Sequence, residues 1–386
     1  MNGLIPFDFE PRTRLIFGAG TIDKLGELAK AEGASRALVV SDPGVVAAGH
    51  TERGISALTG AGIETLCFDK LHENPSTADV SVGLAVAKDF QPELIVGLGG
   101  GSSMDCAKGV NFLYTNGGRM QDYWGVGKAH SDMLPMIAVP TTAGTGSETQ
   151  SFALISDAET HVKMACGDKK AACRMAILDP ELTLTQPQRI TALTGIDALA
   201  HALETYVTKK RNPVSLAFSR ESWRLLSSNL GRVLTEPSDI EARGAMLLGA
   251  SFAGLAIENS MLGATHALAN PLTAQYDMVH GQAIGIMLPH VIRYNGAEFG
   301  SWYQELVGSS AGDAGYPSAA GGPDALADFV AQLVVQAGLP TRLSECGVEE
   351  SKLPELSVDA AKQWTGTFNP RTVGESELNQ LYSLAY

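Results

Sequence analysis

Four residues in the second half of the chain have the types and spacing of a metal site. Asp197 and His201 lie four residues apart in TGIDALAHALE, a spacing that puts both side chains on one face of a helix. His266 in GATHALANPL and His280 in VHG add two more imidazoles. One carboxylate and three imidazoles offer oxygen and nitrogen donors, a set that suits Fe(II) or Zn(II) with one position left open. Spacing alone leaves two other interpretations, a helix-surface ion pair for Asp197 and His201 and a satisfied core residue for His266.

Two segments have the composition of ligand-binding turns. GLGGGSSMDCAKG (97–109) follows the apolar run ELIV, and its glycines would let the backbone approach a pyrophosphate at the start of a helix. It matches neither the Walker A motif nor the full dinucleotide fingerprint, so a tight strand-to-helix turn is the alternative. PTTAGTGSETQ (140–150) follows the run MIAV and is rich in hydroxyl groups, with an ordinary polar loop as the alternative. Because open α/β sheets bind ligands at the carboxyl ends of their strands, the two segments together favour a ligand site.

Asp42, in VVSDPG, follows the apolar run RALVV. An acidic residue at the end of such a strand commonly accepts hydrogen bonds from the ribose hydroxyls of adenosine. The alternative is an aspartate that initiates a turn before Pro43.

The elements that must position these residues form two groups. Up to about residue 180, apolar runs typical of buried parallel strands alternate with helical patterns, which predicts an α/β domain. The expected strands cover 36–40, 93–99, 136–141 and 174–179, and the expected helices cover 20–33 and 76–90. RTRLIFGAG (12–20) is a candidate hairpin at the sheet edge.

Helical patterns dominate from residue 189 to residue 306. The polar stretch TQPQR therefore predicts a boundary between an α/β dinucleotide-binding domain, 1–183, and a helical metal-binding and substrate domain, 184–386. The longest apolar stretch, 245–257, is shorter than the roughly 20 residues of a bilayer span and is expected to be a buried helix. GSSAGDAGYPSAAGGPDA (308–325) predicts a surface loop.

Composition excludes some classes of partner. The 386 residues include 42 acidic and 28 basic ones, for a net charge of −14, which disfavours binding to nucleic acid and to anionic membranes. Asp8 and Glu10 stand where a signal peptide would be apolar, and the five cysteines form no CxxC pair. We expect reduced thiols and a cytoplasmic location.

The motifs together identify a family resemblance. The chain resembles the iron-containing (group III) alcohol dehydrogenases of the dehydroquinate-synthase-like fold, and the resemblance covers essentially the whole chain. It rests on FGAG, VVSDPG, ENPS, GGGSSMDCAK, PTTAGTGSE, the lysine of HVKM, ILDP, TGIDALAHALE, GATHALANPL, VHG and the tail FNPRTVGESELNQLYSLAY.

The resemblance implies an α/β nucleotide-binding domain and an all-α domain, with the active site in the cleft between them. By position, it assigns one divalent metal ion, Fe(II) in preference to Zn(II), to Asp197, His201, His266 and His280. It also implies NAD(H) as the cofactor, a small-molecule substrate and a homodimer.

Cofactor contacts are likewise implied by position. The pyrophosphate would be bound by Gly99, Gly100, Gly101 and Ser102. The cofactor site would be lined by Thr141, Thr142 and Thr145, and Ser147 would lie near the nicotinamide. Asp105 and Lys163 would contact the cofactor or shape its pocket.

One position departs from the family pattern. Many members have HxxxH, whereas here His266 is followed by Asn270. The second histidine is usually credited with proton transfer or substrate contact, so Asn270 is a candidate for a substrate or relay contact. The alternative is that Asn270 only caps a helix before Pro271.

The expected activity is that of a metal-dependent, NAD(H)-linked alcohol dehydrogenase or aldehyde reductase acting on a small, polar or anionic substrate. The alternatives are a glycerol-dehydrogenase-like polyol dehydrogenase using zinc, a dehydroquinate-synthase-like lyase and a non-catalytic nucleotide-binding protein.

Overall fold

The computed structural model describes residues 5–308 and 321–386, and the chain divides into two compact units. The α/β unit comprises residues 10–186, and the helical unit comprises the described residues 5–9, 187–308 and 321–386. The division falls three residues beyond the boundary expected from the sequence. The N-terminal residues belong to the helical unit because Phe9 packs against Phe218, with ring centroids 6.1 Å apart.

The main sheet of the α/β unit has six parallel strands in the order β1-β9-β6-β4-β2-β3. β4, β6 and β9 are buried at every residue, which explains their unbroken apolar sequences. β2, β4 and β6 are neighbours, so the segments that follow them lie at one edge of the sheet. The strands are β1 Arg14–Phe17, β2 Arg36–Val40, β3 Glu64–Phe68, β4 Leu94–Gly99, β6 Met136–Pro140 and β9 Met175–Leu178.

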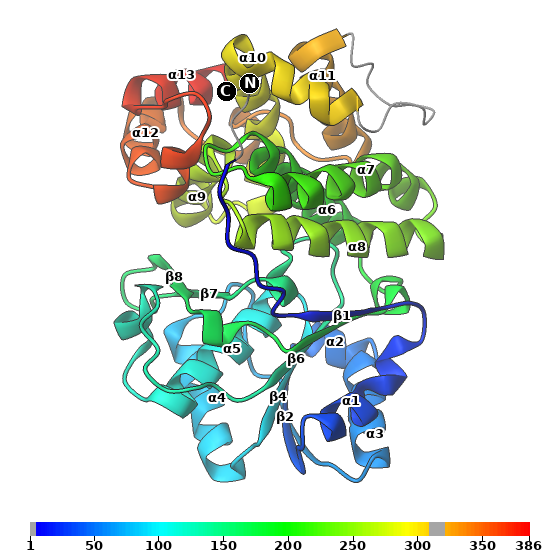
Figure 1. Cartoon of the computed structure of the whole chain (residues 1–386). Helices are drawn as coiled ribbons and strands as arrows, with labels where there is room; N and C mark the ends of the chain where they lie inside the picture. The colour runs from blue at the N-terminus through cyan, green and yellow to red at the C-terminus, as the bar shows by residue number, and fades with distance from the viewer. Residues whose placement is uncertain (1–4, 309–320) are drawn as a thin grey trace. The chain divides into compact units, whose positions relative to one another are not determined.

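Helices cover both faces of this sheet, with α1 and α3 on one side and α4 and α5 on the other (Figure 1). Apolar side chains of the α1 and α3 regions pack with the inward side chains of β2, β4 and β6 in one buried cluster. A smaller sheet, in the order β5-β8-β7, consists of β5 Gly125–Val126, β7 Phe152–Ser156 and β8 Lys163–Gly167. The helices are α1 Leu25–Ala31, α2 Pro43–Ala47, α3 His50–Gly60, α4 Thr77–Phe90 and α5 Gly101–Asn116, with short 3-10 turns at Thr21–Lys24, Met120–Tyr123, Ser147–Thr149, Lys169–Ala171 and Pro180–Thr183.

The hairpin expected at 12–20 is wrong. β1 is a single edge strand that pairs in parallel with β9, from Arg14 opposite Met175 to Phe17 opposite Leu178. No return strand follows, because Gly18 and Gly20 have positive φ and turn the chain into the helices that begin at Thr21.

The helical unit is organised around α6, Gln188–Val207, which packs against α7, α8 and α10. Every residue of α6 from Gly195 to Val207 is buried, so its polar side chains must find partners inside the fold. The other helices are α7 Pro213–Thr235, α8 Ile240–Glu258, α9 Ala264–Tyr276, α10 His280–Gly308, α11 Gly322–Gln336, α12 Leu353–Ala361 and α13 Glu375–Ala385, with 3-10 turns at Ser344–Cys346, Glu350–Lys352 and Trp364–Phe368.

α8 contains the long apolar stretch 245–257. Among the described residues it is the one helix long and apolar enough to cross a membrane by length and composition. Within the fold, 67% of its most apolar window is buried, and the helix packs against α6 and α7. It therefore has the environment of a core helix, as the sequence predicted.

The surface loop predicted at 308–325 falls largely on residues 309–320, which lie outside the described residues. At its ends the prediction is wrong. Gly308 closes α10, and α11 already begins at Gly322 with a proline in its first turn, a position that proline favours because its missing N–H costs nothing there.

Candidate metal and cofactor sites

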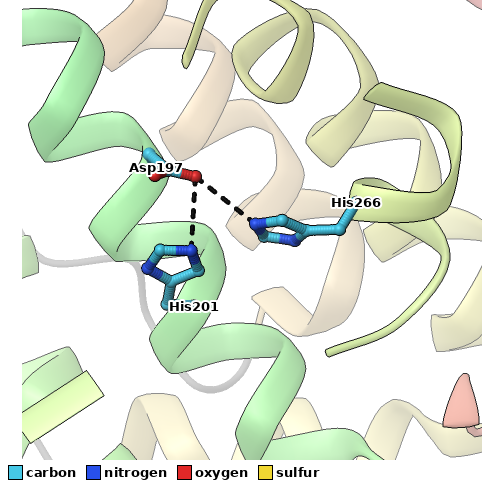
Figure 2. A group of neighbouring side chains, drawn as sticks. All are labelled: Asp197, His201 and His266. Carbon is cyan, nitrogen blue, oxygen red and sulfur yellow. Dashed lines mark ion pairs between the residues drawn. The ribbon is translucent and has the colours of Figure 1, made fainter. Parts of the chain in front are cut away.

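Three helices supply the residues predicted to bind metal. Asp197 and His201 lie one turn apart on α6, and His266 reaches them from the first turn of α9 (Figure 2). Asp197 Oδ1 lies 3.4 Å from His201 Nε2 and 3.4 Å from His266 Nε2. His280, the first residue of α10, has its Nε2 3.8 Å from the same oxygen. The tertiary structure thus gathers all four predicted residues around one carboxylate oxygen.

This group is buried. The side chains of Asp197, His201 and His266 are 9%, 6% and 6% exposed, whereas that of His280 is 26% exposed. The rings of His201 and His266 stack with centroids 4.9 Å apart. The interpretation of Asp197 and His201 as a helix-surface ion pair is therefore wrong, because both residues lie in the interior of the helical unit.

The arrangement fits a metal ion. One donor atom from each of Asp197, His201 and His266 lies within 4.8 Å of the others. Ligands about 2.1 Å from a tetrahedral ion are separated by about 3.4 Å, the separation found here between the oxygen and two of the nitrogens. Within the described chain, Asp197 Oδ1 and His266 Nε2 are buried without a hydrogen bond, and their mutual contact lacks hydrogen-bond geometry. Buried polar atoms left in this way are costly, and a cation between them would satisfy both.

The charges of the group favour the ionised carboxylate. Burial by itself would raise the pKa of Asp197, but the nearby imidazoles of His201, His266 and His280 outweigh it and hold that pKa well below its ordinary value. For His266, burial acts to lower the pKa, while the carboxylates of Glu204 and Asp197 raise it, with a net result of about 9. The pocket therefore favours positive charge beside Asp197.

Glu204 is a functional candidate that the sequence analysis did not single out. It is buried on α6, and its Oε2 lies 2.5 Å from His266 Nδ1. The helical spacing held a signal for it, because positions 197, 201 and 204 are separated by four and three residues and share one face.

In the α/β unit, the two segments predicted to bind a ligand are in direct contact. Gly99 ends β4 and Gly101 begins α5. A Cβ placed on Gly101 would lie 2.7 Å from the methyl group of Thr145, and one on Gly100 would lie 3.3 Å from that of Thr142. The backbone N–H of Thr141 donates to the Gly99 carbonyl at 2.9 Å. Glycine is required here because the second segment packs directly against the backbone of the first.

A buried lysine on α5 binds the second of these segments through hydrogen bonds. Lys108 on α5 is fully buried, and its Nζ donates to the hydroxyl of Ser147 at 3.0 Å and to three backbone carbonyls between residues 147 and 152. The Ser147 hydroxyl in turn donates to Asp105 at 2.7 Å. Burial raises the pKa of Asp105, an effect that Lys108 and Ser147 oppose. Asp105 and Ser147 are thus engaged with each other, and Lys108 is a further residue that sequence reasoning did not select.

Ser102 and Lys163 are connected through Asn74 of the ENPS motif. The backbone N–H of Asn74 donates to Ser102 Oγ at 3.1 Å, and Lys163 Nζ donates to Asn74 Oδ1 at 3.1 Å. Asn74 has a positive φ of 53°, a conformation that asparagine tolerates better than most residues. The ENPS motif is therefore used to join two predicted cofactor contacts.

Asp42 caps a short helix. Its Oδ1 accepts hydrogen bonds from the N–H groups of Gly44 and Val45 at 3.0 and 3.1 Å, as expected of an aspartate before a proline. Its Oδ2 accepts a hydrogen bond from Ser103 on α5 at 3.0 Å. The alternative of a turn-initiating aspartate is therefore present in the structure, and the carboxylate is held at the end of β2 beside the glycine segment.

Asn270 does not cap a helix, so that alternative is wrong. α9 continues through Pro271 to Tyr276, and Asn270 lies in its interior. Pro271 has no N–H to donate to the Ala267 carbonyl four residues earlier, and the hydroxyl of Tyr382 donates to the neighbouring Leu268 carbonyl at 2.6 Å. Asn270 Nδ2 donates instead to Gln363 Oε1 at 3.0 Å. It lies one turn beyond His266 on the same face of α9.

Comparison with known proteins agrees with the fold. Residues 11–180 match the family model described as iron-containing alcohol dehydrogenase, and residues 191–386 match that of the C-terminal region of the same family. Together these features define an oxidoreductase of the alcohol dehydrogenase class. The chain belongs to the iron-containing alcohol dehydrogenase family, which confirms the resemblance and the α/β-plus-helical fold expected from the sequence.

The similar proteins align with this chain over nearly its full length. The chain is 34% identical to 1,3-propanediol dehydrogenase of Klebsiella pneumoniae over 385 residues, or 98% of this chain and 99% of that protein. The crystal structure of a 1,3-propanediol oxidoreductase aligns with a TM-score of 0.94 at 33% identity, covering 99% of this chain and 100% of that one. Sulfoacetaldehyde reductase from Bifidobacterium kashiwanohense, solved in complex with NAD+, aligns with a TM-score of 0.89 at 28% identity over 99% of both chains.

The position of His280 depends on the glycine beside it. A Cβ on Gly281 would lie 2.3 Å from the Leu193 carbonyl oxygen of α6, a backbone atom that cannot move away alone. We expect Gly281→Ala to lower the free energy of unfolding by about 1–3 kcal/mol, the range typical of overpacking, and to displace His280 from Asp197. Denaturant unfolding and metal content measure the two effects.

Gly60→Ala is the matched control, because a Cβ there meets nothing within 4 Å. It should leave both measurements unchanged or raise stability by up to about 1 kcal/mol. Equal stability and metal content in the two variants would contradict the close packing of α10 on α6.

Proposed function

We propose that this enzyme transfers hydride between NAD(H) and a small polar alcohol or aldehyde, with one divalent metal ion bound by Asp197, His201, His266 and His280. The observation that carries the proposal is the buried carboxylate oxygen of Asp197 with three imidazole nitrogens 3.4 to 3.8 Å away. Fe(II) is the proposed ion in preference to Zn(II), in keeping with the description of the family. The metal would polarise the substrate oxygen, and the cofactor would supply the hydride chemistry.

The chain's own residues prepare the two binding sites. In the helical unit, Asp197 supplies negative charge in a buried position, and the imidazoles supply nitrogen donors on rigid helices. In the α/β unit, the backbone N–H groups at the N-terminus of α5 would bind a pyrophosphate, because the helix dipole favours anions there. Asp105, Lys108 and Ser147 hold the hydroxyl-rich segment against these glycines.

Support for NAD(H) and for a short polar substrate comes from the similar proteins. The aligned reductase was solved with NAD+, and the names of two of the similar proteins refer to 1,3-propanediol and to sulfoacetaldehyde. These are short molecules with a second polar or anionic group. The cytoplasmic location and the homodimer stay predictions.

Removal of the metal tests the proposal directly. Turnover should fall at least about a hundredfold when a chelator strips the ion, since Lewis-acid stabilisation contributes several kcal/mol, and Fe(II) should restore more activity than Zn(II). His280→Ala should lose metal and activity together. The readout is NADH absorbance with a panel of short alcohols and aldehydes, and elemental analysis measures the metal. Full turnover by protein verified as metal-free would refute the assignment, and no turnover under any condition would favour a non-catalytic nucleotide-binding protein.

Asp42 should set the preference for NADH over NADPH. Its carboxylate would accept ribose hydroxyls and repel a 2′-phosphate, a charged interaction worth about 1.5–3 kcal/mol, or roughly ten- to a hundredfold. Asp42→Asn keeps a side chain that caps helices well but removes the charge, so it should narrow the ratio of kcat/KM values for the two cofactors. Ser103→Ala is the control, because it removes the Asp42 partner without changing charge. Equal kcat/KM for both cofactors in the unmodified protein would contradict this role.

Asn270 is proposed to orient the substrate or a relay water. An amide cannot titrate, whereas imidazole exchanges protons near neutral pH. Asn270→His should therefore shift substrate preference among short aldehydes or add a limb near pH 6.5 to the profile of kcat. Gln275→His is the control, because residue 275 lies nine positions from His266 and faces the opposite side of α9. If Asn270→His and Gln275→His both leave the kinetics unchanged, Asn270 serves only to bind Gln363.

A further inference from the structure

Glu204 lies outside the four residues proposed to bind the metal, yet it contacts one of them directly. Its carboxylate uses both oxygens: Oε2 lies 2.5 Å from His266 Nδ1, and Oε1 accepts the backbone N–H of Thr265 at 2.6 Å. The side chain is 4% exposed. A carboxylate placed in this way fixes Nδ1 as the protonated nitrogen and leaves Nε2, the atom nearest Asp197, as the one able to bind a metal.

The same contacts cap the helix that carries His266. The N-cap residue of α9 is Gly263, which has no side chain to accept the first N–H groups of the helix. Two side chains from other elements take this role: Glu204 accepts the N–H of Thr265, and Asn369 Oδ1 accepts that of Ala264 at 3.3 Å. A Cβ on Gly263 would lie 3.0 Å from the Asn369 oxygen and 3.1 Å from the Glu204 oxygen, so the glycine makes room for both.

Asn369 is itself fixed by buried hydrogen bonds. It exchanges two amide hydrogen bonds with Asn295 of α10, at 2.7 and 3.0 Å, and donates to the Arg371 carbonyl at 2.7 Å. α6, α10 and the segment before α13 therefore meet at the start of α9. The first turn of α9 is held rigidly, and His266 with it.

Glu204 also sets the charge of the buried group. With neutral imidazoles, Asp197 and Glu204 give it a net charge of −2, which a divalent cation neutralises. Burial of an uncompensated charge is costly, so this balance favours an ion of charge two. A neutral residue at position 204 would leave one unit of positive charge in the interior when the metal binds.

We propose that Glu204 is a positioning residue for the metal, holding His266 with Nε2 toward Asp197 and matching the buried charge to a divalent ion. This inference rests on the metal site of the proposed function. A carboxylate that orients a metal-binding histidine typically contributes ten- to a hundredfold to metal affinity.

The test is the metal affinity of Glu204→Gln, measured by competition between the protein and a chelator of known affinity for Co(II), with the visible spectrum of bound Co(II) as a second readout. We expect affinity to fall roughly ten- to a hundredfold and the spectrum to change, because ring orientation alters the ligand field. Glu204→Asp keeps the charge but shortens the side chain by one methylene, so it should lose less affinity and still change the spectrum. If Glu204→Gln does not fold, the metal affinity of Glu204→Asp provides the test instead.

Asp179→Asn is the matched control. Asp179 is a fully buried carboxylate in the α/β unit, where it accepts the N–H groups of Gly20, Ile22 and Glu181. This variant should lose stability without losing Co(II) affinity, and Asp197→Asn should lose the site itself. If Glu204→Gln and Glu204→Asp bind Co(II) as the unmodified protein does while Asp197→Asn does not, the role of Glu204 is overturned and the metal site stands. Absence of Co(II) uptake by the unmodified protein overturns both.

Discussion

The helical unit depends on one constraint, the burial of the Asp197 carboxylate. A buried charge is tolerated only where other groups compensate it, and here three imidazoles from three helices converge on one of its oxygens. This requirement explains why α6 is surrounded by α7, α8 and α10 yet carries polar residues along one face. It also explains the glycines at the helix starts: Gly263 makes room for the carboxylate of Glu204, and Gly281 lets α10 approach the α6 backbone.

The α/β unit depends on a different constraint, the close approach of threonine side chains to the glycine backbone that follows β4. The glycines after β4 allow Thr142 and Thr145 to lie against them. Lys108 donates hydrogen bonds to backbone carbonyls of the hydroxyl-rich segment that would otherwise be buried without partners. Asp42 and Asn74 tie neighbouring segments to the start of α5. The result is a set of hydroxyl and backbone groups held at the carboxyl edge of the sheet, where α/β proteins bind ligands.

The two units are suited to different binding tasks of an alcohol dehydrogenase. The α/β unit offers shape and backbone donors, which suits a large, partly apolar cofactor. Its buried charged side chains, such as Asp105, Lys108 and Asp179, are engaged in hydrogen bonds within the unit. The helical unit concentrates charge at one point, which suits an ion. Family membership agrees with this division, because one model covers each unit.

The sequence by itself determined the buried strands and the helices that follow them. Apolar runs such as RALVV coincide with β2, because a strand buried on both faces has no choice of residue type, and the spacing of Asp197 and His201 fixed their common helix face. Features that depend on contacts with residues distant in the sequence were decided only by the tertiary structure. β1 became a parallel edge strand through pairing with β9, Asn270 stayed inside a helix that continues through Pro271, and Glu204 and Lys108 gained their roles from atoms 39 to 62 residues away. Local patterns report burial and periodicity, but they do not report which buried polar groups will meet.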